Sequence, residues 1–252
     1  MTALPWVPFV IALAAAFAAG SIPFAVLIGK AKGVDIRTLG SKNAGATNVG
    51  RVLGFRYFLL CFALDAAKGF APVFAFGATV GWTGLDSLTL PPPATVLWLT
   101  LVAAAVMGHM FSPWIAFKGG KGVATGLGAM LGVFPALTIP ALGSLLVFLG
   151  VLWMWRYVSL ASIIAAASAP AWVWYFFNLA SRTLVNPPEE PGAAPQTLPV
   201  RSATYVIATA VLGALIIYKH RANIARLARH QEPTIGAGRA QSDASTSVTT
   251  SK

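Results

Sequence analysis

The chain has 252 residues, of which 57% are hydrophobic and only 10% are charged. A water-soluble domain of this length could not stay in solution with so little charge, so the composition predicts an all-α integral membrane protein. The net charge of +11 is typical of membrane proteins, whose cytoplasmic loops collect Lys and Arg, and it therefore does not indicate a nucleic-acid partner.

Seven apolar stretches are candidates for membrane-spanning helices, which need about 20 residues to cross the hydrocarbon core. In chain order they cover residues 5–29, 57–79, 94–112, 122–138, 139–155, 157–179 and 203–219. The first stretch is too long for a signal peptide and no positive charge precedes it, so we interpret it as an uncleaved span.

The distribution of Lys and Arg predicts how the chain is oriented. Most of these residues lie in the loops after the first and last spans and in two further loops on the same side: Lys30, Lys32, Arg37, Lys42, Arg51, Arg56, Lys118, Lys121, Arg156, Arg221, Arg226, Arg229, Arg239 and Lys252. The opposite loops, 80–93 and 180–202, hold only Arg182 and Arg201. The positive-inside rule then places the N-terminus outside and the C-terminus in the cytoplasm.

The chain is expected to form one transmembrane domain over residues 1–232. Residues 233–252 are rich in Ser, Thr and Gly and are predicted to be a disordered polar cytoplasmic tail. Cys61 is the single cysteine and lies in an apolar run, which excludes an intramolecular disulfide. The three histidines and seven carboxylates are scattered, so we predict no metal and no cofactor.

The first cytoplasmic loop has the residue types that wrap an anion. Glycines let backbone N–H groups approach closely, hydroxyl and amide side chains add donors, and an arginine offers a bidentate fork to phosphate. The same residue types also make ordinary turns, so this loop alone leaves both interpretations open. Its candidates are Gly40, Ser41, Asn43, Gly45, Thr47, Asn48, Gly50 and Arg51.

A second loop places glycines around two lysines directly before an apolar helix. Its candidates are Lys118, Gly119, Gly120, Lys121 and Gly122. A helix N-terminus beside a lysine favours phosphate, although positive-inside bias with glycine hinges is the alternative. The loop is not a nucleotide P-loop, because Ile115 and Gly122 stand where that motif needs Gly and Ser or Thr.

Further polar residues flank or enter the predicted spans. Ser159 opens the sixth span after Arg156, while His220 and Asn223 follow the seventh on a basic helix that can also lie on anionic lipid. Asp65 and Lys68 lie three apart within the second span and are expected to form a structural pair. His109 remains open as a base, a core residue or a ligand.

Four motifs together resemble the bacterial acyl-phosphate:glycerol-3-phosphate acyltransferases, the PlsY family, over residues 20 to about 232. They are Gly20-Ser-Ile-Pro-Phe, Gly40-Ser-Lys-Asn-Ala-Gly-Ala-Thr-Asn, Lys118-Gly-Gly-Lys-Gly-Val-Ala-Thr and His220-Arg-Ala-Asn-Ile-Ala-Arg-Leu. The resemblance implies a seven-helix enzyme of the plasma (inner) membrane with its active site on the cytoplasmic face. It also implies the substrates glycerol 3-phosphate and acyl phosphate, membrane lipid around the enzyme, and a further enzyme that supplies the acyl phosphate.

The implied reaction moves a fatty acyl group to the 1-hydroxyl of glycerol 3-phosphate, giving lysophosphatidic acid and phosphate in the first acylation of phospholipid biosynthesis. The resemblance places catalytic residues at Ser41, Arg51, His220 and Asn223, substrate-binding residues at Asn43, Thr47, Asn48, Lys118, Gly119, Gly120, Lys121, Gly122 and Ser159, and a structural glutamate at Glu232. Two positions depart from the family pattern: Lys42 stands where Gly is common, and His230 where a small residue is usual.

A mechanistic hypothesis follows. Lys121 and Arg51 hold the two phosphates, Ser41 and Asn48 orient the glycerol hydroxyl, and the acyl chain stays in lipid. The proton acceptor is left open between His220 and the substrate's own phosphate, and a covalent acyl-serine is a competing possibility. The rival functions are a carrier for small anionic phosphates and a lipid-anchored scaffold.

Overall fold

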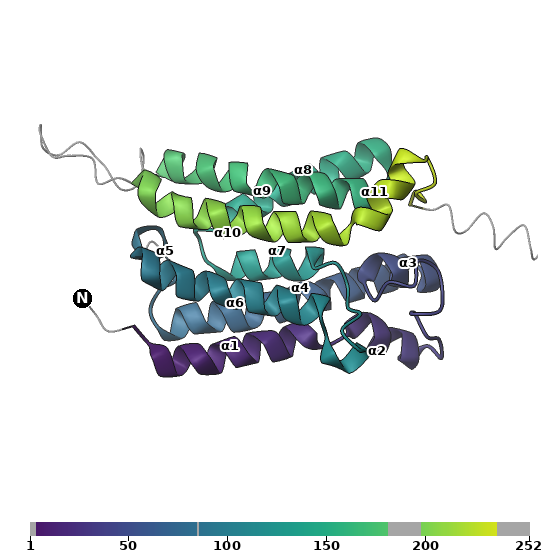
Figure 1. The fold of residues 1–252 in the computed structure, drawn as a ribbon, viewed down its shortest axis with the longest axis horizontal. Helices are drawn as coiled ribbons and strands as arrows, with labels where there is room; N and C mark the ends of the chain where they lie inside the picture. Colours follow the sequence, from purple (N-terminus) through teal and green to yellow (C-terminus); the bar gives the residue numbers. More distant parts are fainter. Residues whose placement is uncertain (1–3, 85, 181–197, 236–252) are drawn as a thin grey trace, which may run out of the picture.

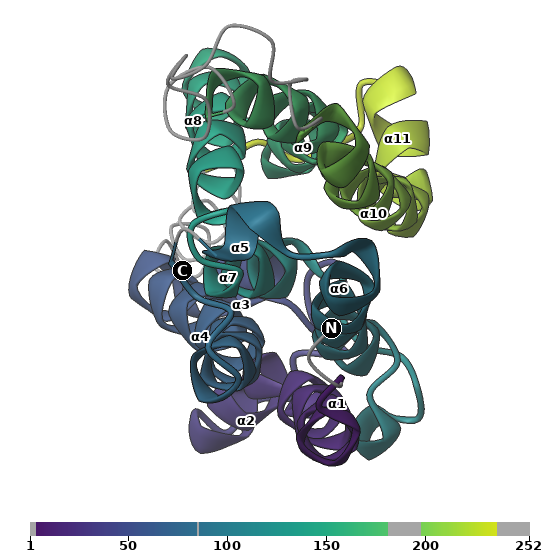
Figure 2. The same ribbon diagram turned by 90° about the vertical axis from the view of Figure 1, so that its left-hand side faces the viewer.

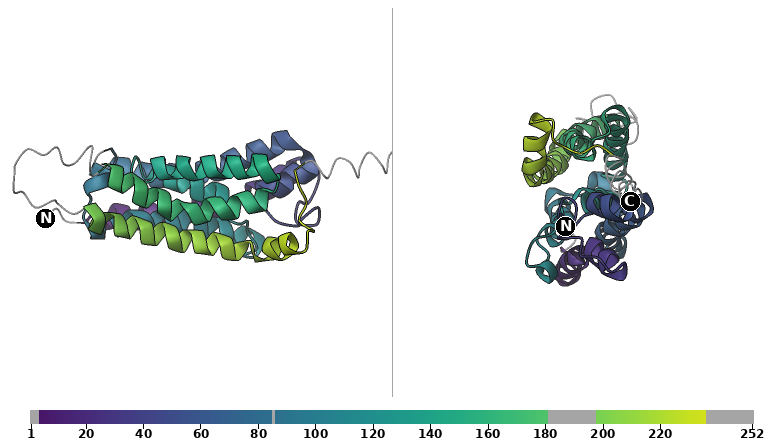
Figure 3. Two further views of the ribbon diagram at one scale, coloured as in Figure 1. Left: turned by 90° about the horizontal axis from the view of Figure 1, so that it is seen from above. Right: turned by 90° about the vertical axis from the view of Figure 1, so that its right-hand side faces the viewer.

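The computed structural model describes residues 4–84, 86–180 and 198–235, and in these ranges every regular element is a helix. The helices are α1 (Trp6–Ser21), α2 (Phe24–Ala31), α3 (Ala46–Leu53), α4 (Phe55–Thr79), α5 (Asp86–Thr89), α6 (Pro92–Met110), η1 (Pro113–Ile115), α7 (Val123–Gly132), α8 (Thr138–Trp155), α9 (Val158–Ala180), α10 (Leu198–Lys219) and α11 (Arg221–Ala228). The long helices lie roughly along one axis (Figure 1), and the same alignment is visible from above (Figure 3).

Six helical segments in the described part of the chain are long and apolar enough to cross a membrane. The first combines α1 and α2 over Trp6–Ala31, which the backbone interrupts at Ile22 and Pro23. The other five are α4, α6 with η1, α8, α9 and residues Ser202–Lys219 of α10. The all-α integral membrane fold predicted from composition is therefore confirmed, and six of the seven predicted stretches correspond to these segments.

The fourth predicted stretch, 122–138, folds differently from the others. Its helix α7 has ten residues, which span about 15 Å, whereas the hydrocarbon core is about 30 Å thick. Helix α7 packs closely on α4 because both carry glycines at the contact: a Cβ on Gly128 would collide with the carbonyl oxygen of Ala66, and a Cβ on Gly69 with that of Thr125. The predicted count of seven spans is thus not confirmed.

The bundle has two halves with α7 between them. Helices α8, α9, α10 and α11 form one group, and α1, α2, α4 and α6 form the other (Figure 2). Helix α9 packs against both α8 and α10, while α1 packs against α6 and α4 against α7. The seam between the halves is therefore lined by α7 on one side and by α8, α9 and α10 on the other.

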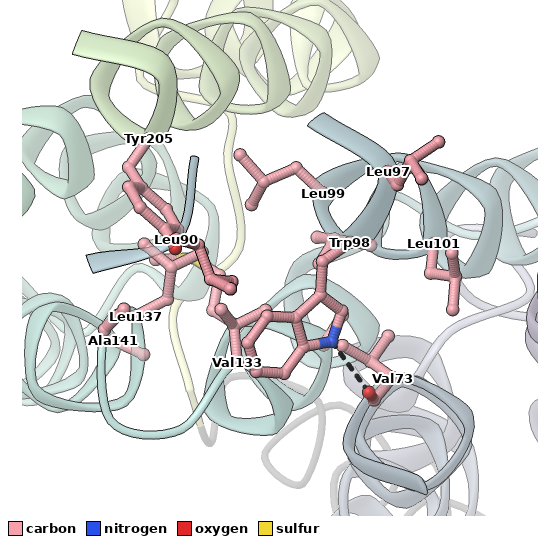
Figure 4. Close-up of a cluster of buried hydrophobic side chains, with 14 of the residues drawn as sticks. Val73, Leu90, Leu97, Trp98, Leu99, Leu101, Val133, Leu137, Ala141 and Tyr205 are labelled. Atoms are coloured by element: carbon pink, nitrogen blue, oxygen red, sulfur yellow. Dashed lines mark hydrogen bonds between the residues drawn. The ribbon is translucent and has the colours of Figure 1, made fainter. Parts of the chain in front are cut away.

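The hydrophobic core fills the end of the bundle near α5. Trp98 of α6 is fully buried, and its Nε1 donates a 2.9 Å hydrogen bond to the carbonyl oxygen of Val73 (Figure 4). The Tyr205 hydroxyl donates a 2.7 Å bond to the carbonyl oxygen of Ser87. Large apolar side chains such as Leu137 and Val133 pack around these two aromatic residues. Close packing of apolar side chains therefore fills the interior of the bundle at this end.

The start of α1 and helix α11 lie at opposite ends of the bundle (Figure 1). This arrangement agrees with termini on opposite sides of a membrane, while the assignment of the α11 side to the cytoplasm stays a prediction. After α11 the chain returns to the α8–α9 turn, where the Ile235 N–H donates a 2.9 Å bond to the carbonyl oxygen of Arg156. The rest of the predicted tail, 236–252, lies outside the described residues.

Candidate active site

A pocket of about 710 Å³ opens at the end of the bundle where α3 and α11 lie (Figure 1). Most of the site residues expected from the sequence line it: Ser41, Asn43, Thr47, Asn48, Arg51, Lys121, Gly122, Ser159, His220, Asn223 and Glu232. Three expected residues, Lys118, Gly119 and Gly120, are not part of its wall, and Lys118 is exposed. The fold thus brings together four segments that are far apart in the sequence.

Four helices begin at this pocket. The first turns of α3, α7, α9 and α11 or the residues that cap them supply much of the wall, namely Gly45, Ala46, Thr47, Gly122, Val123, Ala124, Val158, Ser159, His220 and Asn223. Each helix N-terminus carries roughly half a positive charge from its aligned peptide dipoles. None of these four helices has an acidic residue in its first turn. The backbone alone therefore makes the pocket attractive to an anion.

The first loop is shaped by Asn48, which is 1% exposed. Its Nδ2 donates to the carbonyl oxygens of Ile36, at 2.9 Å, and Leu39, at 3.1 Å, and its Oδ1 accepts a 2.7 Å bond from the Ser41 N–H. These bonds occupy the amide and hold Ser41 at the pocket rim. Lys42, one of the two departures from the family pattern, adopts a left-handed backbone with φ of 58°.

A chain of polar contacts links the second loop to α11 and the segment after it. The Lys121 ammonium group donates to Asn223 Oδ1. Asn223 Nδ2 donates a 2.8 Å bond to Glu232 Oε1, and Arg226 Nε donates a 2.7 Å bond to Glu232 Oε2. Arg51 of α3 lies 3.7 Å from Glu232 Oε1. The Glu232 carboxylate thus pairs with cationic groups from α3 and α11 and reaches Lys121 of the second loop through Asn223.

The charge balance of this network is positive. Burial lowers the pKa of Lys121 to about 8, partly offset by the attraction of Glu232. Burial alone would raise the pKa of the Glu232 carboxyl, but the hydrogen bonds from Asn223 and Arg226 outweigh it and lower that pKa. At neutral pH Lys121, Arg51 and Arg226 are charged against the single carboxylate, which leaves the pocket able to hold an anionic group.

His220 is buried between α10 and α11 and lines the pocket. Its Nδ1 lies 2.8 Å from the carbonyl oxygen of Ile216. A carbonyl can only accept, so Nδ1 carries the proton and Nε2 is the acceptor. Burial and the nearby Lys121 lower the pKa of His220 to about 4. The ring is therefore neutral at physiological pH.

Two further polar residues also belong to the pocket wall, namely Asp65 of α4, which was expected to pair with Lys68, and His109 of α6, whose role the sequence left open. The expected ion pair of Asp65 with Lys68 is present, with 2.6 Å between Oδ1 and Nζ. The Nδ1 of His109 lies 3.6 Å from the same carboxylate oxygen. Helical spacing indicated the Asp65–Lys68 pair. Nothing in the sequence connects this pair to His109, which lies on a different helix much further along the chain.

An apolar groove of about 610 Å³ adjoins the polar pocket and was not expected from the sequence. It shares Phe62, Val123, Phe148 and Ser162 with the pocket and follows the seam between the two halves of the bundle. Small side chains make room for it, among them Gly126, Ala141, Ala165, Ala169 and Gly213. In the sequence these residues are indistinguishable from those of ordinary close helix packing.

The fold and the site define a class: an integral membrane protein that can hold a phosphate-sized anion at one end of its bundle, beside a groove for an apolar chain. Residues 10–230 match the family described as glycerol-3-phosphate acyltransferase. The chain belongs to that family.

Individual relatives agree with this assignment. The chain is 42% identical to a glycerol-3-phosphate acyltransferase of Aquifex aeolicus over 86% of its own length and 94% of the relative's. It is 36% identical to one of Geotalea daltonii over 86% and 93%. The crystal structure of PlsY, an integral membrane glycerol 3-phosphate acyltransferase, in its glycerol 3-phosphate form is 37% identical, with a TM-score of 0.70 over 92% of this chain and 98% of that one.

Proposed function

We propose that this protein transfers a fatty acyl group from acyl phosphate to the 1-hydroxyl of glycerol 3-phosphate. The products are lysophosphatidic acid and inorganic phosphate, and the reaction is the first acylation of phospholipid biosynthesis. The observation that carries the proposal is the junction of the two cavities. A cationic pocket built on four helix N-termini is continuous with an apolar groove through Phe62, Val123, Phe148 and Ser162.

Both substrates fit this junction. Each carries a phosphate, and Lys121 and Arg51 supply two cations to the pocket wall. The donor also carries an acyl chain, and we propose that the groove offers it a protein surface as an alternative to lipid. With the phosphates in the pocket and the chain in the groove, the acyl carbonyl lies at the boundary. Holding both reactants there supplies much of the rate by proximity.

In the reaction the 1-hydroxyl oxygen attacks the acyl carbonyl carbon. The bond between that carbon and the bridging oxygen breaks, and inorganic phosphate leaves with the electron pair. Lys121 and the N–H groups at the start of α7 neutralise charge on the departing phosphate. Ser41 at the rim orients the glycerol hydroxyl, with its own backbone fixed by Asn48. Asn48 therefore acts on the loop and not on the substrate.

The hydroxyl proton has two candidate acceptors, His220 and a substrate phosphate. The low pKa of His220, about 4, makes it the weaker base, since a phosphate monoester has a second pKa of about 6. The phosphate is thus the preferred acceptor. His220 Nε2 serves as a hydrogen-bond acceptor in the pocket. Because Asn223 is bonded to both Lys121 and Glu232, we assign it to positioning Lys121.

The protein is proposed to act in the plasma (inner) membrane, with the pocket on the cytoplasmic side, as one domain over residues 1–232. The Lys and Arg excess of the loops at the pocket end supports this orientation. A separate enzyme must supply the acyl phosphate, because this chain is proposed to consume it and not to make it.

The test is a paired assay on the detergent-solubilised protein. Glycerol 3-phosphate is supplied with either acyl phosphate or acyl-CoA, and phosphate release and lysophosphatidic acid are measured together. We expect matched products with acyl phosphate alone and their loss in Lys121→Ala. Absence of product from folded protein would reject the proposed function and favour the rival, a carrier of small anionic phosphates. Uptake assays in vesicles test that rival. The packed core around Trp98 at the opposite end disfavours that rival.

A further inference from the structure

The buried ionisable residues of α4 and α6 have no part in the chemistry described above. Asp65 is 2% exposed and Lys68 6% exposed, and together with His109 they form a cluster at the pocket wall. Ionisable groups at membrane depth are expensive to bury, which makes such a cluster a candidate for a functional role. The motif Gly20-Ser-Ile-Pro is likewise unexplained by the proposed reaction, and the cluster contacts it.

The His109 ring lies against the second loop. The Gly120 N–H donates a 3.2 Å bond to the His109 carbonyl oxygen. A Cβ on Gly120 would collide with Nε2 of the His109 ring and would also lie 3.0 Å from the carbonyl oxygen of Ala44 in the first loop. Gly120 therefore sits where both anion-holding loops and the end of α6 meet, one residue before Lys121.

The other edge of the ring faces the ion pair. His109 Nδ1 lies 3.6 Å from Asp65 Oδ1, and Lys68 Nζ forms an ion pair with the same oxygen at 2.6 Å. Lys68 Nζ also donates a 2.6 Å bond to the carbonyl oxygen of Ile22 at the break between α1 and α2, an oxygen that accepts a second bond of 3.1 Å from the Phe24 N–H. This contact ties the cluster to the Gly20-Ser-Ile-Pro motif.

We propose that His109 is a positioning residue for the second loop. Its ring is held by Asp65, Lys68 and the α1–α2 break, and it sets the distance between the two loops at Gly120. That distance determines where Lys121 meets the phosphate of the substrate. This role depends on the proposed function only in that the KM measurement requires acyltransferase activity. Displacing the ring raises the KM for glycerol 3-phosphate by moving Lys121, and kcat falls as well, because Lys121 also neutralises charge on the departing phosphate.

The test is a double-mutant cycle between Gly120→Ala and His109→Ala on the full-length detergent-solubilised protein. In the parent background Gly120→Ala forces a methyl group against the ring, and we expect KM for glycerol 3-phosphate to rise about tenfold or more. With His109→Ala in place the collision with the ring is gone and only the 3.0 Å contact with the Ala44 carbonyl oxygen remains, so we expect the same change to raise KM less than about twofold. An equal effect of Gly120→Ala in both backgrounds overturns the proposal.

Gly119→Ala is the matched control. Its Cβ would collide with the backbone carbonyl oxygen of His109, which every variant keeps. Its effect on KM should therefore be the same in both backgrounds. Asp65→Asn tests the support of the ring: it should raise KM in the parent and leave KM unchanged in His109→Ala. A further effect in His109→Ala would show that Asp65 acts by another route. If His109→Ala does not fold, His109→Asn also removes the ring edge at Gly120 and replaces it in the cycle.

The same cycle is repeated with inorganic phosphate as the probe. The thermal unfolding midpoint is followed against phosphate concentration to give an apparent affinity for each variant. Coupling in phosphate affinity with no acyl transfer in the parent would reject the proposed function and keep the positioning role. Acyl transfer in the parent without coupling in either readout would support the proposed function and reject the positioning role of His109.

Discussion

Asn223 accepts a hydrogen bond from the Lys121 ammonium group, although the two residues are 102 positions apart in the chain. The same amide donates to Glu232, so its oxygen faces a cation and its nitrogen faces an anion. An amide is the side chain that satisfies both at once, since a carboxylate cannot donate and an ammonium group cannot accept. The relationship joins the second loop to the helix after the last span.

Replacing Asn223 by Ala removes both bonds of this amide. Lys121 then loses the acceptor that holds it over the pocket, and Glu232 loses a donor. We expect kcat/KM for glycerol 3-phosphate to fall about 100-fold, which corresponds to about 2.7 kcal/mol of transition-state stabilisation. Gln231→Ala, on an exposed neighbour in the same segment, is the control and should retain full activity. A loss of tenfold or less in Asn223→Ala would contradict the positioning role.

The pH dependence should report Lys121. Burial lowers its pKa to about 8, and only the protonated ammonium form neutralises phosphate. Below pH 8 the group is charged and kcat/KM is high, and above it kcat/KM falls about tenfold per pH unit. In Lys121→Arg the guanidinium stays charged, so this basic limb should disappear even though overall activity drops. If the fall in kcat/KM near pH 8 persists in Lys121→Arg, the titrating group is not Lys121.

Glu232→Gln should reduce both activity and stability. The neutral amide no longer balances Arg51 and Arg226, so we expect kcat/KM to fall about tenfold. In the folded protein the pKa of Glu232 lies below its ordinary value of 4.5, and its stabilising effect is therefore present above that pH and lost as the pH falls through the folded pKa. The difference in unfolding midpoint between parent and variant should be full at pH 7 and shrink below about pH 4.5. A difference independent of pH would count against a charged Glu232.

The groove predicts a chain-length effect. Helices α7, α8, α9 and α10 line the groove, and each contributes about seven residues along it. The groove therefore extends about 10 Å from its pocket end near Ile216 to its far end near Ala169. Ala169→Leu fills the far end, so kcat/KM should fall about tenfold with palmitoyl phosphate and stay unchanged with butyryl phosphate. Ala167→Leu, on the exposed side of the same helix, should change neither. Equal losses with both donors would place the acyl chain elsewhere.

Lys42→Gly should stabilise the protein. Lys42 holds a φ of 58°, which costs a residue with a side chain about 1–2 kcal/mol, while glycine adopts it freely. Glycine also increases the entropy of the unfolded state, which offsets part of this difference. We therefore expect the free energy of unfolding to rise by about 0.5–1 kcal/mol. The unfolding midpoint in detergent measures it, and Lys42→Ala should show no gain because alanine meets the same steric cost. A gain in both variants would point to the charge of Lys42 as the cause.

The sequence was sufficient to predict the membrane fold, most span positions and most of the pocket. Hydropathy located the spans because each helix must satisfy its backbone within lipid by itself. Ser41, Lys121 and His220 were identifiable through the resemblance to the PlsY family, because their segments read alone left other interpretations open. The Lys42 departure from the family pattern also falls at a left-handed backbone position, and so does His230 with a φ of 55°.

The remainder depends on contacts between distant segments. The length of α7 is set by its burial between the two halves of the bundle, and an apolar stretch of the same composition would also fit a full span. The meeting of His109 with Asp65, the attachment of Asn223 to Lys121 and the groove at the seam all require the relative placement of helices. Lys118 was included with Lys121 because the two share a motif, but its side chain is exposed outside the pocket wall.

The position of Glu232 means that the anion site already contains an anion. In the proposed reaction a phosphate entering the pocket shares Arg51 with Glu232, a carboxylate that belongs to the protein, and we expect its affinity to stay below what the cations alone would give. Weak retention suits a reaction in which phosphate is released at every turnover, because a site that held phosphate tightly would be blocked by its own product. The carboxylate thus sets an upper limit on product inhibition.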